Sequence, residues 1–268
     1  MVQWPRMDRT RGLALAIWAT LLLAALWSVQ AAAVHAQANP TLARLEIDVW
    51  PEFDRAAALV ILRGELAADV TLPAPVSLRV PTSSGGPAAV ASAASADAPL
   101  LTMPYERSAV GVDFLTLTFE VPDRFFQVEF YDPLKTAGAD RSYRYVWTGD
   151  LPVAGQLTLQ LQEPAEATEV SVQPDLGAAF AGPYGLVYRE ADLGAFEEGK
   201  TLTVDVSYKK SGSRTSADIL GLATATPEPS GSDGSDGGIP RWLIGAALLA
   251  AAAIVAAGFA FWQHRRSG

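Results

Sequence analysis

The residues best suited to chemistry lie in the short stretch VWPEFDR. Here Trp50 and Phe53 stand beside Glu52 and Asp54, at the end of an apolar run. Aromatic rings offer flat apolar faces that can stack on sugars, and glycoside hydrolysis needs two carboxylates at a set separation. Together with Trp147 in the later stretch YRYVW, these residues are the candidate ligand-binding residues for a carbohydrate or peptidoglycan.

Core packing is the competing interpretation of the same aromatic residues. Rings recur at every second position in the stretches FFQVEFYD and YRYVW, so several of them fall on one face of a strand. Cores of β-sandwiches ordinarily contain such residues. The sequence favours this structural role over ligand binding and nominates no catalytic pair of carboxylates.

Most other catalytic chemistry is excluded by composition. The chain has no cysteine, and its two histidines, His35 and His264, lie close to its ends. The residues between them therefore lack the His and Cys side chains that a Ser-His-Asp triad, a thiolate nucleophile or a Cys/His zinc site requires. The S-x-x-K pattern at Ser207 and Lys210 lacks its S-D-N and K-T-G partners, and its odd spacing on a strand sends the two side chains to opposite faces. We expect no enzyme activity, no metal and no cofactor.

Strands must position any such site. Apolar and polar residues alternate in RLEIDV, SLRV, LTLTFEV and LTLQLQ, which is typical of strands with one buried face. AALVILRG is apolar almost throughout, as expected of a central strand covered on both faces. Turns rich in proline and glycine separate these runs, and no helical period appears outside the two apolar end segments. The predicted class is all-β, with about ten to twelve strands.

The region that follows the first apolar segment divides near residue 122. We expect two immunoglobulin-like or fibronectin-like β-sandwiches, at 39–122 and 123–210. One larger jelly roll is the alternative, because the sequence VPD at the boundary is short for a linker. Residues 211–240 are rich in Gly, Ser, Pro and Asp and predict a disordered linker.

The amino-terminal segment has the pattern of a secretory signal. Residues 1–38 combine a basic start, an apolar middle and the small-residue exit Ala36-Gln37-Ala38. This order is that of a signal peptide. Because the apolar middle is long, an uncleaved signal anchor is the alternative, and both place the following residues outside the cell.

The carboxyl-terminal segment predicts a membrane span. Residues 241–263 contain a long uncharged run bordered by Trp242 and Trp262, and the tail 264–268 carries Arg265 and Arg266. The run is long enough to cross a bilayer, tryptophans favour its interfaces, and arginines favour the cytoplasm. We therefore expect a single transmembrane helix in the plasma membrane, with an extracytoplasmic amino-terminal domain and a cytoplasmic carboxyl terminus.

Charge limits the partners. Residues 39–240 hold 28 of the 29 acidic and 14 of the 20 basic residues, a formal charge of −14. Such a surface repels nucleic acid. The expected partners are the lipid bilayer, through the helix, and an envelope protein or polysaccharide. Small residues spaced four apart, such as Ala246 and Ala250, would also allow a homodimer through the transmembrane helix.

The order of parts indicates a class of function. Signal, β domains, low-complexity stalk, single span and basic tail resemble many bacterial surface proteins in architecture. We expect a non-enzymatic binding or scaffold module of the bacterial cell envelope. A carbohydrate-binding or carbohydrate-active surface protein and an accessory subunit of a membrane complex are the alternatives.

Overall fold

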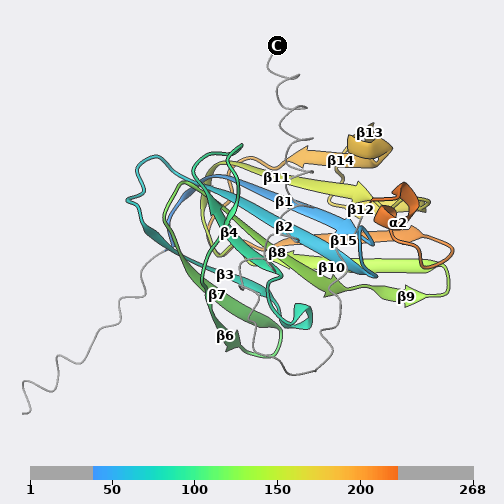
Figure 1. The fold of residues 1–268 in the computed structure, drawn as a ribbon, viewed down its shortest axis with the longest axis horizontal. Coiled ribbons are helices and arrows are strands. Elements are labelled where there is room, and N and C mark those ends of the chain that lie inside the picture. The colour runs from blue at the N-terminus through green and yellow to red at the C-terminus, as the bar shows by residue number, and fades with distance from the viewer. Residues whose placement is uncertain (1–38, 223–268) are drawn as a thin grey trace, which may run out of the picture. The chain divides into compact units, whose positions relative to one another are not determined.

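The computed structural model describes residues 39–222 (Figure 1). Within that range no helix is long and apolar enough to cross a bilayer. The membrane-directed predictions lie outside the described residues: the signal peptide (1–38), the transmembrane helix (241–263) and the basic tail (264–268), with Trp242, Trp262, Arg265 and Arg266.

The described residues are mostly β-strand, in fifteen strands with one short α-helix. The strands are β1 (Leu42–Pro51), β2 (Ala57–Leu66), β3 (Ala74–Pro81), β4 (Ala89–Ala93), β5 (Leu101–Thr102), β6 (Glu106–Val110), β7 (Phe114–Val121), β8 (Phe125–Pro133), β9 (Lys135–Ala137), β10 (Asp140–Trp147), β11 (Val153–Glu163), β12 (Thr168–Gln173), β13 (Phe180–Ala181), β14 (Val187–Asp192) and β15 (Leu202–Lys209). The helix is α2 (Ser216–Leu220), and short 3-10 turns occupy Thr82–Ser84 and Pro183–Gly185.

Three sheets build a sandwich. The largest has eight strands in the order β13-β14-β11-β1-β2-β8-β4-β5 (Figure 1). A four-stranded sheet, β12-β15-β10-β9, and a three-stranded sheet, β3-β7-β6, send their inward side chains into the same core as the large sheet. The all-β prediction is therefore confirmed at the level of class.

The predicted division near residue 122 does not separate two sandwiches. In the eight-stranded sheet, β2 from the first half hydrogen-bonds with β8 from the second, and β1 pairs in parallel with β11. Residues from both halves also contribute to one buried cluster. Strand pairing across the boundary outweighs the local turn signal at VPD, so residues 39–222 lie in one compact unit.

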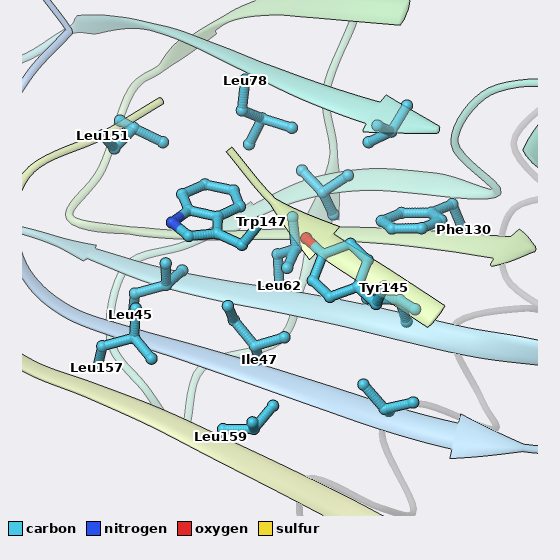
Figure 2. Close-up of a cluster of buried hydrophobic side chains, with 14 of the residues drawn as sticks. Leu45, Ile47, Leu62, Leu78, Phe130, Tyr145, Trp147, Leu151, Leu157 and Leu159 are labelled. Atoms are coloured by element: carbon cyan, nitrogen blue, oxygen red, sulfur yellow. The ribbon is translucent and has the colours of Figure 1, made fainter. Parts of the chain in front are cut away.

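The main core lies between the large sheet and the two smaller ones. Trp147 of β10 is 1% exposed and packs between Leu78 and Leu151 on one side and Leu45 and Ile47 on the other (Figure 2). Alternation along each strand supplies these inward residues, because successive side chains point to opposite faces.

β2 is covered on both faces, as its nearly unbroken apolar sequence predicts. Val60 packs in the main core, whereas Ile61 packs on the outward side of the large sheet with Trp50 and Tyr188. A strand buried on both faces cannot alternate between apolar and polar residues. The large sheet therefore has a second, smaller apolar cluster on its outward face.

Side chains cap the free edge of β3. Asn39 donates to the carbonyl oxygens of Ser77 and Asp150, at 2.8 and 2.7 Å, and accepts from the Ser77 amide at 2.8 Å. The Asp150 carboxylate accepts from the amide and Nε of Arg79, at 2.8 and 2.5 Å. The backbone groups of Ser77 and Arg79 at this edge therefore have side-chain hydrogen-bond partners where no further strand pairs with β3.

We expect Asn39→Ala to lower the free energy of unfolding by about 1–3 kcal/mol, because it leaves partly buried backbone groups of Ser77 without partners. Urea denaturation followed by tryptophan fluorescence measures the loss. Asn39→Asp keeps an acceptor for the Ser77 amide but turns a carboxylate oxygen toward the carbonyl oxygens of Ser77 and Asp150, so its loss should be at least as large. An unchanged stability in Asn39→Ala would show that the cap contributes nothing.

The first part of the predicted linker is folded. Residues 211–222 lie on the domain instead of forming part of a linker: Ser216 and Ala217 donate backbone hydrogen bonds to the carbonyls of Glu52 and Phe53, at 2.9 and 2.7 Å. Thr215 and Asp218 form a capping box at the start of α2, in which each side chain accepts from the other's backbone amide. The rest of the predicted linker, residues 223–240, lies outside the described residues.

Candidate functional site

The end of β1 and the turn that follows it carry four of the five predicted ligand-binding residues. Trp50 and Phe53 meet edge to face, with ring centroids 5.1 Å apart. Both rings are buried, at 3% and 8% exposure, within the outward apolar cluster of the large sheet. Stacking on a sugar needs an accessible ring face, so these two rings contribute packing.

Glu52 is the centre of a buried ionic cluster. Its carboxylate accepts from the Tyr208 hydroxyl at 2.9 Å and lies 3.5 Å from both Arg141 Nε and Lys210 Nζ. Each of these four side chains is almost fully buried. The Lys210 ammonium also donates to the Arg214 carbonyl at 2.7 Å. The cluster therefore fastens the segment after β15 to the β1–β2 turn.

Asp54 and Trp147 occupy two further environments. Asp54 accepts a hydrogen bond from the Tyr131 hydroxyl at 2.8 Å, and the guanidinium of Arg55 lies 4.1 Å from the centre of the Tyr131 ring. Trp147 belongs to the main core, not to the outward cluster that holds Trp50 (Figure 2). The structure thus places Trp50, Glu52, Phe53 and Asp54 at the end of β1 and in the turn after it, and leaves Trp147 apart from them.

The S-x-x-K pattern has the geometry that the alternating strand predicted. Ser207 is exposed on β15, whereas Lys210 is buried against Glu52. The two side chains do not meet, so the serine has no lysine base in this arrangement.

A second group of charges lies on the outward face of the large sheet. Arg63 of β2 forms ion pairs with Glu46 and Asp48 of β1, the first at 2.7 Å. Its Nε also donates to Gln127 of β8 at 3.2 Å, and Gln127 donates to Glu129 at 2.5 Å. Alternation in RLEIDV placed Glu46 and Asp48 on one face, and the antiparallel pairing of β1 with β2 brings their partner Arg63 beside them.

Two of the three carboxyl groups in this cluster, Asp48 and Glu129, have raised pKa values. Burial raises the pKa of Asp48 to about 8; the nearby Arg63 guanidinium opposes that rise and the Glu46 carboxylate adds to it. Burial also raises the pKa of Glu129. Two carboxyl groups with different proton affinities are the basis of acid–base catalysis. Here the side chain of Asp48 is 1% exposed and bound to Arg63, so it cannot touch a substrate.

This burial predicts a pH dependence. The pKa of Asp48 rises from its ordinary value of 3.8 to about 8, so the folded state retains a proton that the unfolded state loses. Stability should therefore fall as the pH rises between these values and level off above about pH 8. Asp48→Asn removes this proton, so the wild type should lose stability relative to the variant over that range in urea denaturation.

The matched control is Asp205→Asn, which removes another carboxylate paired with an arginine. Asp205 binds Arg144 at 2.6 Å, and its side chain is 44% exposed. Its stability difference from the wild type should vary little with pH over the same range, because exposed pairs contribute little. A wild type and Asp48→Asn with parallel pH profiles would contradict the assignment.

A hollow next to the segment 93–100 lies beside these charges. It has a volume of about 150 Å³. The side chains of Arg44, Glu65 and Asp97 stand at it without a hydrogen bond or ion pair to any residue within 39–222. Its lining also includes Glu46, Arg63, Gln127 and Phe125.

A second hollow lies at the β9 end of the four-stranded sheet. It has a volume of about 320 Å³ and includes Lys135, Asp140, Glu169 and Lys209. Glu169 and Lys209 already form an ion pair with each other at 2.7 Å. Lys135 and Asp140 form no such pair within the described residues, so this hollow has two unpaired charged side chains against three at the first.

Metal binding finds no support in the described part of the chain. Among residues 39–222, no three His, Cys, Asp or Glu side chains are arranged to hold an ion.

Two comparisons with known proteins found no relative of this chain. No protein-family model matches the chain, and a search of curated proteins finds no match. The function of the candidate site must therefore be argued from the geometry of its own residues.

Proposed function

We propose that the chain is a non-enzymatic binding or scaffold module of the bacterial cell envelope. In this proposal a single immunoglobulin-like or fibronectin-like sandwich lies outside the plasma membrane, and the segment 241–263 anchors it. The acidic composition and the order of the sequence segments support this location.

The observation that carries the proposal is the contrast between the buried and the accessible charges. Glu52 and Asp48 are both buried and tied to basic side chains, which suits a structural role. Arg44, Glu65 and Asp97 stand unpaired at the hollow beside segment 93–100, where a partner can reach them. Unpaired charges at an accessible hollow favour recognition of a charged or polar group.

The size of the hollow favours a protein partner. About 150 Å³ is smaller than the roughly 300–1,000 Å³ of typical small-molecule sites. It would take one side chain of a partner, with neighbouring surfaces completing the contact. The carbohydrate alternative keeps one supporting feature, the half-buried ring of Phe125 among polar groups.

Cross-linking and co-purification of the full chain from its own membranes tests the proposal. We expect a captured envelope protein whose yield drops in Arg44→Glu, because the change reverses an unpaired charge at the hollow. Arg144→Glu is the control: it makes the same change on β10, where Arg144 is exposed and paired with Asp205. Equal capture by both variants would remove the hollow from the binding surface.

A sugar array probed with the full chain separates the carbohydrate alternative. Binding to defined glycans, lost in Arg44→Glu and kept in Arg144→Glu, would replace the protein partner by a polysaccharide. Turnover of a bound glycan would contradict the non-enzymatic role.

A further inference from the structure

Five of the six sheet edges in residues 39–222 are blocked against a further strand. β5, β9 and β13 have two or three residues each. β12 has a register shift beside Glu169, whose φ is +52°. β3 is capped by Asn39 and Asp150. Short strands, bulges and caps are the means by which proteins protect sheet edges from unwanted pairing.

The sixth edge, β6, has none of these protections. It runs over Glu106–Val110 with an unbroken register to β7, and all five residues are exposed. It is the terminal strand of the three-stranded sheet (Figure 1). Within residues 39–222 its outer backbone groups have no partner. A regular, exposed edge of this kind is suited to pairing with another strand.

Exposed apolar side chains flank and occupy the same strand. Tyr105, directly before β6, is 41% exposed, Val110 at its end 44%, and Val112, two residues beyond it, 85%. They are three of the six large apolar side chains exposed in the part of the chain that the structure describes. The unprotected edge therefore carries exposed apolar residues at both of its ends.

We propose that β6 pairs with β6 of a second copy of this chain, antiparallel, about a twofold axis through Ser108. This alignment places Glu106 opposite Val110 and Arg107 opposite Ala109, so no like charges face each other. Opposite positions share the same place in the alternation of backbone hydrogen bonds, as an antiparallel ladder requires. Tyr105 of one copy comes beside Gly111 at the end of β6 in the other.

The result is a continuous six-stranded sheet made from two three-stranded ones. A second copy fits this edge because ERSAV, paired antiparallel with itself about Ser108, places no like charges opposite each other. The pairing does not depend on the proposed binding role and uses a surface separate from the hollow beside segment 93–100.

Ser108 allows a specific test, since on the twofold axis it faces its own copy. Sedimentation of the full chain in mild detergent should show a dimer that grows with protein concentration. Ser108→Lys alone, and Ser108→Glu alone, should each raise the dissociation constant about fivefold through repulsion of like charges across the ladder. An equimolar mixture of the two variants should restore association, because lysine then faces glutamate.

The control is Thr203→Lys, at an exposed position of β15, which lies inside the four-stranded sheet. It should leave the dimer unchanged. A monomer at every concentration overturns the proposal. A dimer whose dissociation constant is the same in both Ser108 variants as in the wild type is joined at another surface and also overturns it, as does a mixture that associates no better than each variant alone.

Discussion

Glu52→Gln should lower the free energy of unfolding by about 3–5 kcal/mol, because it removes the only negative charge from a buried group that contains two cations. The carboxylate lies 3.5 Å from Arg141 and from Lys210 and accepts from the Tyr208 hydroxyl. A neutral amide of the same size leaves both cations uncompensated. Urea denaturation at neutral pH measures the loss.

Glu166→Gln is the matched control for this prediction. Glu166 has the same left-handed backbone, with φ +63° against +48° for Glu52, and pairs with Arg214 at 2.9 Å. Both side chains of that pair are at least 50% exposed, so its loss should stay below about 1 kcal/mol. Equal losses in the two variants would show that burial does not set the strength of the Glu52 cluster.

Trp147→Ala should cost about 3–5 kcal/mol, since it empties a large space in a core that cannot close around it. Trp147 is 1% exposed and packs against leucines from three different segments (Figure 2). Denaturation midpoints give the loss, and Trp147→Phe should recover part of it. Tyr105→Ala, at a side chain 41% exposed, is the control and should change stability by about 0.5 kcal/mol or less.

The same variant separates the two interpretations of the sequence. If Trp147 bound a ligand at an accessible surface, Trp147→Ala would keep its stability and lose binding. The core position predicts the reverse order, a large loss of stability whether or not a ligand is present.

Alternation of apolar residues predicted individual strands well because each has one face in the core. β1, β3, β7 and β11 were all predicted in this way, and β2 from its nearly continuous apolar run. β4 was harder, since AVASA is short and small, and only Val90 joins the main core. Its pairing with β8 comes from the sheet, not from its own sequence.

The order of strands could not be derived from local patterns. A turn sequence such as VPD looks the same inside one sandwich and between two, while the parallel pairing of β1 with β11 joins residues more than a hundred positions apart. Helix α2 had a readable signal, the capping-box spacing of Thr215 and Asp218. The surrounding Gly and Ser residues concealed it.

The residues of the candidate site could be predicted from the sequence, but their burial could not. VWPEFDR correctly indicated a group of neighbouring aromatic and acidic residues, but burial depends on what covers them. Residues Leu186 and Tyr188 pack with Trp50, and Lys210 reaches Glu52 from the other end of the chain. Conversely, the sequence did not identify Arg44 as a candidate binding residue, because its unpaired charge matters only beside the hollow that segment 93–100 helps to form.

Protease protection of the full chain in intact cells tests the envelope location most directly. A tag fused after Gly268 should survive added protease, while residues 39–222 should become cleavable from outside, because Arg265 and Arg266 favour the cytoplasm. Permeabilised cells are the control and should lose the tag as well. A β domain protected until the membrane is opened, or a tag removed from intact cells, would contradict an extracytoplasmic binding module.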